Sequence, residues 1–589
     1  MIKNLILYLN KNDLIKLILI LILTIGSSIF ELIGIGSIPI FLGVILNPEK
    51  VFIYIPEYFK PFLSNFGSSS ELIIFFCFVL FFIFLIKNIY LFSVNFIQAS
   101  YFRDLRIKNS DKLLKYFFSR PYIYFVNNNP DKLLRSLGGD LDLANNYIEA
   151  NLNIMKETIL VVLICILLVS VSNNTAIIVF FFIGLISYIV LRLFKKKLSS
   201  LAKINFIERA EQNKIVYQIF YNIQDIKILL KENFFLNIFQ KNILNLKKTE
   251  FFNTIFSKSL RLIFETFAVL SIVLIIIFLS KSDSQIIELL PLLSLLGVSA
   301  IRLIPSFNSI TLGFTIIRKS EISFDSISKY MKRARELKKI FFQEYSKNDC
   351  SSKMIDIELN DINFKYPESN EYTLKNINLR IKKNTSIGII GKTGCGKSTL
   401  IKLIMGLLKP NSGNILSNKK DIHKDVRSWF NNISYIPQNI FLADDTIKNN
   451  IAFGTENNLI DLDRVKYSIK LAGLEKFIKD LPNGLETRVG DGGFKISGGQ
   501  VQRIGIARAL YKEPNIFILD EATSSLDQKT EDEIINDFFK FNKNKLTIMV
   551  SHRLSSLKFC DEVFLIEDGI IKDQGNIDEI ILRNNGIKK

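Results

Sequence analysis

The stretch GKTGCGKST, residues 391–399, fits the pattern G-x-x-x-x-G-K-[ST] of a loop that binds the phosphates of a nucleotide. Glycines let successive backbone N–H groups of such a loop turn toward an anion, and its lysine reaches the β- and γ-phosphates. The preceding TSIGII (385–390) is typical of a short buried strand. The following TLIKLIMGLL (399–408) is typical of a helix whose N-terminus faces the anion. Together these pieces predict an α/β nucleotide-binding domain.

The loop supplies most of the residues that we expect to hold ATP and Mg²⁺. The hydroxyl that follows the lysine completes the shell of the metal ion in such loops, so Ser398 is a predicted Mg²⁺ ligand. The residues expected to contact the nucleotide here are Gly391, Thr393, Gly394, Cys395, Gly396, Lys397, Ser398 and Thr399. The loop makes nucleotide binding the expectation and leaves open how the energy is used.

The composition points to a membrane protein. Of the 589 residues, 49% are hydrophobic and 50 are Phe, which is too apolar for an ordinary soluble enzyme. The net charge of +19 comes from basic residues that gather in loops beside apolar runs. That placement fits loops facing anionic lipid better than a nucleic-acid groove. The five cysteines lack the spacing of a metal site, so we expect neither zinc nor disulfides.

Six apolar segments are long enough, or nearly so, to cross a membrane core of about 30 Å. They lie near residues 14–46, 71–98, 152–172, 175–194, 259–280 and 286–313. The third and fourth are joined only by residues 172–174, Ser-Asn-Asn, which predicts a tight turn between two antiparallel spans. We therefore expect an all-α six-helix transmembrane domain over residues 1–345.

The distribution of lysine and arginine gives the expected orientation. These residues are concentrated in the two long polar connections, 99–151 and 195–258, and are sparse on the opposite side. The positive-inside rule places these connections and both termini in the cytoplasm. Residues 1–12 are either an interfacial helix or a lead-in to the first span, and residues 47–70 are either an external helix or a plain loop.

Three basic residues fall inside the predicted spans, where ionisable groups are costly and are candidates for function. Lys87, Arg261 and Arg302 all lie in the cytoplasmic half, and together they could receive an anionic headgroup such as a pyrophosphate. Two other interpretations stay open. Arg261 alone could snorkel to the membrane surface, and Glu31 and Glu265 could be structural counter-charges.

The sixth span leads into the soluble half. Pro291 and Pro305 predict a kink in this span. The charged helical pattern RKSEISFDSISKYMKRARELKK (318–339) predicts that the helix continues into the cytoplasm. The polar stretch SKNDCSSK (346–353) breaks this pattern, and we place the domain boundary there.

From residue 353 onward, strands and helices alternate and short motifs follow in order. They are NFKYP (363–367), the phosphate loop, SYIPQN (434–439), ISGGQ (496–500), IFILD (516–520) and VSHR (550–553). In this combination residues 353–589 resemble the nucleotide-binding domain of ATP-binding cassette (ABC) transporters, which is an α/β P-loop NTPase domain.

The resemblance implies a role for each motif. Tyr366 would stack on adenine, and Gln438 and Asp520 would join Ser398 as ligands of Mg²⁺. Glu521 would position and polarise the attacking water, and His552 would contact the γ-phosphate. Ser497, Gly498, Gly499 and Gln500 would close over ATP held by another subunit. The resemblance thus implies an ATP hydrolase whose catalytic residues are Glu521 and His552.

Six spans followed by one such domain resemble an exporter-type half-transporter, with the fold called type I exporter or type IV ABC. The resemblance implies a homodimer, with a heterodimer left open. Coupling helices are expected near 121–126 and 219–230, and a solvated helical face is the alternative at both places. The stretches at 30–49, 119–136 and 222–235 resemble PglK-like flippases of lipid-linked oligosaccharides. That likeness implies ATP-driven flipping of a polyprenyl-pyrophosphate glycan across the bacterial inner membrane, with the ATPase domain in the cytoplasm.

Alternatives remain at this point. The same architecture serves exporters of lipid A-like lipids, drugs and peptides. A nucleotide-gated channel or regulator is disfavoured because gating without turnover does not require both Glu521 and His552. A soluble cassette protein that acts on nucleic acid would lack the six spans.

Overall fold

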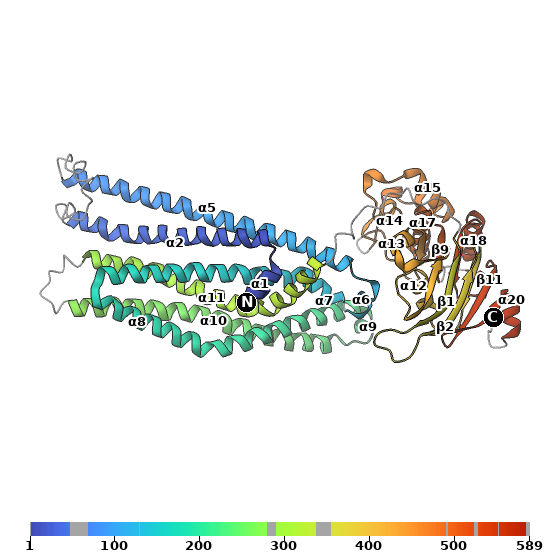
Figure 1. The fold of residues 1–589 in the computed structure, drawn as a ribbon, viewed down its shortest axis with the longest axis horizontal. Helices are drawn as coiled ribbons and strands as arrows, with labels where there is room; N and C mark the ends of the chain where they lie inside the picture. The colour runs from blue at the N-terminus through green and yellow to red at the C-terminus, as the bar shows by residue number, and fades with distance from the viewer. Residues whose placement is uncertain are drawn as a thin grey trace. The chain divides into compact units, whose positions relative to one another are not determined.

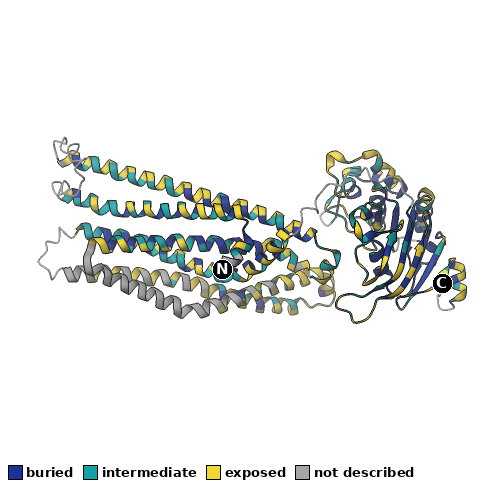
Figure 2. Ribbon diagram, in the orientation of Figure 1, coloured by how far each residue is buried: buried dark blue, intermediate teal, exposed yellow. Residues whose placement is uncertain are grey.

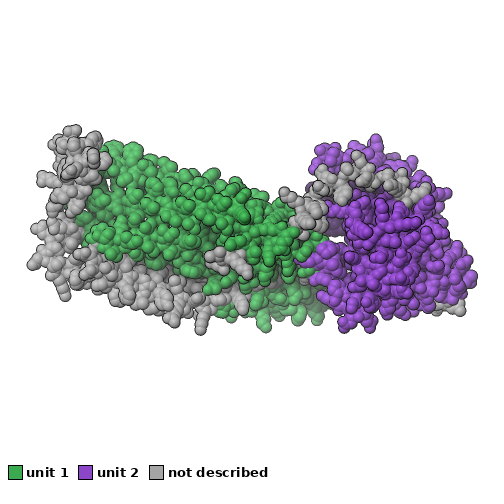
Figure 3. Space-filling model, in the orientation of Figure 1, with its two compact units in different colours: residues 1–120, 128–341 green, residues 121–127, 342–589 purple. Residues whose placement is uncertain are grey.

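The chain is described here from a computed structural model. The described residues are 2–46, 69–128, 130–279, 290–336, 355–490, 493–522, 528–551 and 553–584; only the backbone is described for 172–199, for scattered positions in 201–279 and for a few others. Two compact units result: Met1–Arg120 with Asn128–Phe341 (unit 1), and Pro121–Asn127 with Phe342–Lys589 (unit 2) (Figure 3). Three expectations fall on residues outside the description: nearly all of the segment 47–70, the boundary at 346–353 and the role of His552.

Unit 1 is built from helices (Figure 1). They are α1 (Ile2–Tyr8), α2 (Lys11–Leu46), α5 (Ser69–Phe118), α7 (Pro130–Arg135), a π-helical turn (Ser136–Asp140), α8 (Leu141–Tyr221), α9 (Ile223–Ile228), α10 (Glu232–Leu279) and α11 (Leu290–Glu336). In the part of the chain that is described, four helical stretches are long and apolar enough to cross a membrane: Lys11–Leu46, Ser70–Phe118, Lys132–Val171 and Leu290–Glu336. The predicted spans at 175–194 and 259–280 fall in α8 and α10, where side chains are wholly or partly undescribed. The expectation of a helical transmembrane domain is confirmed.

Small residues of α2 let α5 pack closely against it. A Cβ added at Gly26 would lie 2.4 Å from Tyr90 Oη, and one added at Gly34 would lie 3.0 Å from Lys87 Cδ. The Tyr90 hydroxyl also donates a hydrogen bond of 3.2 Å to the Leu23 carbonyl oxygen. Close approach through small residues, with a hydrogen bond between helices, suits a membrane, because apolar burial supplies no driving force there.

The two expected breaks in the helices have different outcomes. The backbone of α8 is assigned as helix through residues 172–174, where the sequence predicted a tight turn between two antiparallel spans, and the ribbon of α8 reverses direction along its length (Figure 1). The reversal agrees with the prediction, while the helical assignment reflects that Ser and Asn each disfavour a helix by less than about 1 kcal/mol. Of the two prolines expected to kink the last span, Pro305 lies inside α11, and Pro291 is the second described residue of this helix, a position where a proline is tolerated.

Both ends of unit 1 are helical. Residues 2–8 form α1, whose Tyr8 is buried with its ring 5.4 Å from that of Phe324, so α1 packs against α11. The last span does continue as a helix, because α11 extends to Glu336.

The described residues of unit 2 form three sheets. The strands are β1 (Ile357–Phe364), β2 (Leu374–Ile381), β3 (Ser386–Ile390), β4 (Ser412–Ser417), β5 (Lys420–Asp421), β6 (Ile433–Ile436), β7 (Asp445–Thr446), β8 (Arg488–Val489), β9 (Ile516–Asp520), β10 (Leu546–Val550), β11 (Glu562–Glu567) and β12 (Ile570–Gly575). The central sheet has the order β12-β11-β3-β10-β9-β6 and is parallel except for β12. An antiparallel sheet has the order β2-β1-β4-β5, and β7 pairs with β8.

Helices surround these sheets. They are α6 (Tyr122–Asn127), α12 (Lys397–Ile404), α13 (Val426–Asn431), α14 (Ile447–Ile451), α15 (Leu462–Leu471), α16 (Glu475–Lys479), α17 (Gly498–Tyr511), α18 (Gln528–Phe541), α19 (Leu554–Leu557) and α20 (Ile577–Arg583). Every residue of β3 and β10 is buried, as expected for parallel strands covered on both faces (Figure 2).

The short helix α6 belongs to unit 2, although the chain on either side of it belongs to unit 1. Its Tyr122 and Ile123 pack against the hydrophobic core beneath β1 and β2, and the Lys402 ammonium lies 6.0 Å from the centre of the Tyr122 ring. A coupling helix was predicted at this position, and a helix forms here.

Candidate active site

The parallel strands of unit 2 bring four predicted motifs to one edge of the central sheet. The phosphate loop follows β3, the Gln438 motif follows β6, Asp520 ends β9, and the segment that contains His552 follows β10. The carboxyl ends of parallel strands meet at one edge, and ligands bind at that edge in α/β sheets. Motifs that are 160 residues apart in the sequence therefore converge.

The phosphate loop has a backbone that demands glycine at two positions. Gly391 and Gly396 have φ angles of +153° and +108°. A Cβ would lie 2.2 Å from the Ile566 carbonyl oxygen at Gly391 and 2.7 Å from Leu374 Cδ2 at Gly396. The loop therefore packs against its neighbours with no room for a side chain, and its last glycine leads directly into α12.

The lysine of the loop is held in place by the loop itself. Lys397 is only 6% exposed, and its Nζ donates to the carbonyl oxygens of Gly391 at 2.6 Å and Lys392 at 3.0 Å. Ser398 is exposed at the start of α12, where the predicted metal ligand must be reached. Nearby, the hydroxyls of Thr399 and Tyr366 lie 3.3 Å apart, so the predicted adenine-binding ring is next to the loop helix.

The carboxylate of Asp520 emerges at the end of a buried strand. Tyr435, on the neighbouring part of β6, donates its hydroxyl to Asp520 Oδ2 at 3.0 Å. Burial raises the pKa of Asp520, and the Tyr435 hydrogen bond lowers it in part. Burial and the adjacent carboxylate in turn raise the pKa of Tyr435, which keeps this phenol protonated as a donor. Sequence reasoning missed Tyr435; its place two residues before the Pro437–Gln438 motif was the available signal.

The next residue, Glu521, contacts the predicted metal ligand Gln438. Gln438 Nε2 donates to Glu521 Oε2 at 2.6 Å, and the backbone N–H of Glu521 donates to the Val550 carbonyl oxygen at 3.0 Å. Glu521 has a φ of +50°, which is uncommon for a residue with a side chain. Strain of this kind persists only where the surroundings impose it, and it concentrates at functional sites.

The motif ISGGQ begins a separate helix. Ser497 caps α17 in a capping box: its Oγ accepts from the Gln500 N–H at 3.3 Å, while Gln500 Oε1 accepts from the Ser497 N–H at 2.8 Å. Gly498 and Gly499 form the first turn. Within the described part of the chain, no hydrogen bond or ion pair joins these four residues to the phosphate loop.

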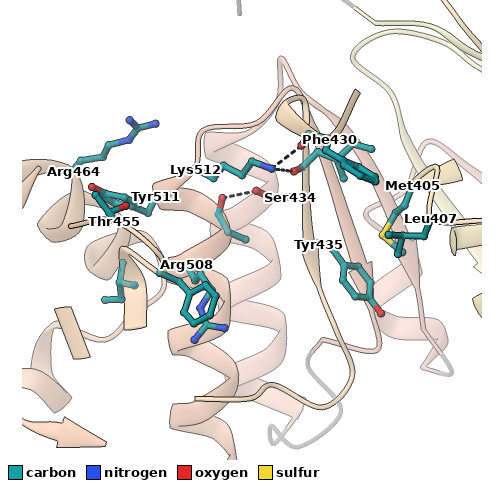
Figure 4. A pocket seen from close by; sticks show the side chains of 14 residues that line it. Met405, Leu407, Phe430, Ser434, Tyr435, Thr455, Arg464, Arg508, Tyr511 and Lys512 are labelled. Atoms are coloured by element: carbon teal, nitrogen blue, oxygen red, sulfur yellow. Dashed lines mark hydrogen bonds between the residues drawn. The ribbon is translucent and has the colours of Figure 1, made fainter. Parts of the chain in front are cut away.

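A groove of about 690 Å³ lies beside this site in unit 2 (Figure 4). Tyr435 lines it together with Phe430, Phe453 and Arg508, and the Arg508 guanidinium lies 4.8 Å from the centre of the Phe453 ring. Lys512 stabilises one wall by donating to the Phe430 and Ile433 carbonyl oxygens at 2.7 and 2.6 Å. Tyr435 is thus shared between the groove and the Asp520 carboxylate.

A second candidate site lies among the helices of unit 1. The Arg302 guanidinium on α11 forms an ion pair with Glu31 on α2, through Nε and through Nη2 at 3.0 Å. Glu157 on α8 accepts from the same Nη2 at 3.4 Å, and Ser306 Oγ accepts from Nη1 at 3.1 Å. The counter-charge predicted at Glu31 is present, and Glu157 is an addition that the sequence did not reveal.

Of the other two predicted basic residues, the structure describes the side chain of Lys87 but not that of Arg261. Lys87 lies against Gly34, one turn from Glu31, and its ammonium is 4.3 Å from the centre of the Phe84 ring. The side chains of Arg302, Glu31 and Lys87 therefore share one region between helices. The side chain of Arg261 lies outside the described residues, so its place near this cluster stays a prediction.

The chain was compared with known proteins. Residues 374–524 match the family model described as ABC transporter, and residues 14–298 match the model described as ABC transporter transmembrane region. A putative export ATP-binding/permease protein of Rickettsia prowazekii is 38% identical over 231 residues, which cover 38% of this chain and 39% of the relative. An ATP-dependent lipid A-core flippase of Salmonella paratyphi A is 36% identical over 230 residues, which cover 39% of each.

A solved structure of a bacterial Atm1-family ABC exporter with ATP bound superposes with a TM-score of 0.75. The match covers 98% of both chains at 17% sequence identity, so it shows a common fold. The sequence matches to the two curated relatives, by contrast, span about two fifths of the relatives' length.

Proposed function

The chain belongs to the ABC transporter family, with a transmembrane region and one ATP-binding domain in a single polypeptide, and on this premise we propose that it is an ATP-driven exporter of an amphipathic, lipid-linked substrate. The observation that carries the proposal is the convergence of Lys397, Asp520 and the Gln438–Glu521 pair at one edge of the sheet of unit 2. A chain that served only as a scaffold or a channel has no need of a strained glutamate held beside a metal ligand.

In this proposal the nucleotide is ATP with Mg²⁺. The loop amides and Lys397 bind the phosphates, Tyr366 stacks on the adenine, and Ser398, Gln438 and Asp520 hold the ion. The donor set suits Mg²⁺, a hard cation that prefers carboxylate, hydroxyl and amide oxygens. A bound Mg²⁺ would neutralise charge on the phosphates, and Glu521 would orient the attacking water and accept its proton. His552 completes the predicted site.

Two copies of the chain form the working unit in this proposal. The ISGGQ motif presents a capped helix N-terminus, an anion-binding arrangement, that has no bond to the phosphate loop of its own chain in the described residues. A second copy can bring its motif to that loop, and each copy would then complete the other's site. Exposed apolar side chains at the end of α9 also support a dimer. Ile228, Leu229 and Leu230 are 63–80% exposed, and a second subunit could cover them.

The proposed substrate is a polyprenyl-pyrophosphate-linked oligosaccharide, moved from the inner to the outer leaflet of the bacterial inner membrane. Lys87 supports an anionic headgroup because it is a cation within the helices whose attractive partner, Glu31, is already bound to Arg302. A lipid A-like lipid, a drug or a peptide is the second candidate, favoured by the sequence match to a lipid A-core flippase. The termini and the ATPase domain face the cytoplasm in either case.

The test is the ATPase activity of the purified protein in lipid, with and without lipid-linked oligosaccharide. Stimulation by the glycolipid, abolished in Glu521→Gln and weakened in Lys87→Gln, would support the proposal. If lipid A stimulates hydrolysis that depends on Glu521 and the glycolipid does not, the proposed substrate is wrong, but the protein is still an exporter. No hydrolysis under any condition would overturn the mechanism.

For the homodimer, the control is a mixture of two inactive copies, Lys397→Ala and Ser497→Arg. If each site combines one chain's loop with another chain's motif, the mixed dimer keeps one site in which both parts are intact. Activity recovered on mixing supports shared sites. A mixture that stays as inactive as either copy, although the copies associate, contradicts them.

A further inference from the structure

A groove of about 370 Å³ lies between α2 and α5 in unit 1, away from the Arg302 cluster. Its lining changes character along its length. On α2, Asp13 and Lys16 are followed at helical spacing by Leu19 and Leu23; on α5, Ile97 is followed by Tyr101, Asp104 and Lys108. The lining of α2 therefore runs from charged to apolar, and the lining of α5 runs from apolar to charged.

The charged parts of the α2 and α5 linings lie next to each other. Tyr101 Oη donates to the Asp13 carbonyl oxygen at 3.0 Å, and Lys108 Nζ is 2.7 Å from both Asp13 carboxylate oxygens. The charged ends of α2 and α5 thus meet at one end of the groove, and Leu19, Leu23 and Ile97 line the other. The groove has a polar head and an apolar wall, which are the two halves of a membrane lipid.

At the polar end of the groove, Lys16 is a cation without a partner among the described residues. Asp13 is occupied by Lys108, and Asp104 is bound by Arg103 at 2.8 Å. Lys16 is exposed and has no hydrogen bond or ion pair within the described part of the chain. An ammonium group without a partner at the rim of an apolar groove is available to an anion from outside the chain.

The surroundings add positive charge. Lys112, one turn beyond Lys108 on α5, and Arg335 near the end of α11 both lie within electrostatic reach of Asp13. Arg335 is fixed there by a hydrogen bond of 2.9 Å from Nη1 to the Ile6 carbonyl oxygen. Cations around this end of the groove outnumber the carboxylates, so a net negative ligand complements it better than a zwitterionic one.

We propose that this groove binds an anionic membrane phospholipid, with its phosphate at Lys16 and Lys108 and an acyl chain along Leu19, Leu23 and Ile97. Lys108 uses two of its three N–H groups on Asp13, which leaves one for the phosphate. Exposed Ile15, Ile18 and Ile22 on the same helix border the hydrocarbon. Basic pockets between membrane helices on the cytoplasmic side are suited to anionic headgroups. The site is distinct from the transport substrate's and does not depend on the proposed function.

The test uses the full-length protein in detergent, without nucleotide. Native mass spectrometry measures the lipid retained as phosphatidylglycerol or phosphatidylcholine is titrated in. We expect a preference for phosphatidylglycerol that falls about fivefold in Lys16→Gln, since a basic residue near a membrane surface contributes about 1 kcal/mol. Lys11→Gln is the matched control: Lys11 is exposed on the same helix and lies about 140° around it at 100° per residue.

A second variant tests the apolar wall. Leu19→Trp places a ring over the groove from an exposed position, so folding is not at stake, and it should reduce retention of phosphatidylglycerol while soluble glycerol phosphate fails to compete in the native protein. The proposal is overturned if both phospholipids bind equally. It is also overturned if Lys11→Gln loses as much as Lys16→Gln, since a diffuse surface charge would then suffice, or if glycerol phosphate displaces the lipid.

Discussion

The side-chain amide of Gln438 donates to the carboxylate of Glu521, with 2.6 Å between Nε2 and Oε2. The first residue follows β6 and the second follows β9, two strands that pair directly in the sheet. A predicted metal ligand and the predicted base are thus coupled before any nucleotide chemistry is considered. Whatever moves the Gln438 segment also changes the environment of the carboxylate that must activate water.

Replacing Glu521 by Gln should therefore abolish turnover and preserve nucleotide binding. The amide is nearly the same size but cannot accept the proton of the attacking water, and general-base catalysis contributes about 10²- to 10⁴-fold. The measurement is kcat for ATP hydrolysis together with ATP affinity by equilibrium binding. Glu513→Gln is the control, because Glu513 has the same φ of +50° and lies at the far end of α17, in an ion pair with Arg464. Equal losses in both variants would mean that the loss of turnover is not specific to the Glu521 carboxylate.

Tyr435→Phe should move the acid limb of the ATPase pH profile to higher pH. Burial raises the pKa of Asp520, and the Tyr435 hydroxyl opposes that shift by hydrogen bonding to the carboxylate. Without the hydroxyl the pKa rises further, so the metal-binding carboxylate takes up its proton at a higher pH as the solution is acidified. Well above that pKa the two proteins should bind Mg²⁺ alike. A profile that only changes in height, with its acid limb unmoved, would contradict this role.

The sequence predicted those parts of the site that are local in the chain. The phosphate loop, its strand and its helix lie within a few turns, and the steric demand for glycine at 391 and 396 is written into the motif. Tyr435 was not predicted as a site residue, because its partner, Asp520, is 85 residues away and only the pairing of β6 with β9 brings them together.

The membrane unit was less predictable for a related reason. Hydropathy identifies a span but not which residues of different spans face each other, so the sequence did not single out Glu157, inside the third predicted span, as a partner of Arg302. The reversal of the chain within α8 was predictable, but the helical backbone of residues 172–174 was not, because polar residues end a helix only where its backbone has an alternative to its own hydrogen bonds.

The glycines of the phosphate loop should differ in what they tolerate. Gly391 and Gly394 both have positive φ, but a Cβ at Gly391 would meet the Ile566 carbonyl oxygen at 2.2 Å, whereas nothing lies within 4 Å of one at Gly394. Gly394→Ala should cost about 1–3 kcal/mol of backbone strain, and Gly391→Ala should cost more because a backbone atom must also move. Thermal unfolding with and without ATP measures both. Equal destabilisation would show that the loop relaxes freely at residue 391.

The Arg302 cluster should respond unequally to loss of its two carboxylates. Glu31 binds the guanidinium through two nitrogens, and Glu157 accepts from one at 3.4 Å, so Glu31→Gln leaves a buried cation with its weaker partner. Breaking a buried pair from one side costs about 3–5 kcal/mol, and Glu157→Gln should cost less. Glu149→Gln is the control, because its pair with Arg106 is partly exposed and such pairs contribute about 0–1 kcal/mol. Thermal unfolding in one detergent gives the ranking. Replacing both partners by groups of similar size removes the uncompensated charge. Adding Arg302→Met to Glu31→Gln should therefore restore part of the stability. A double variant that is as unstable as the sum of the two single variants would mean that these side chains matter for packing and not for charge.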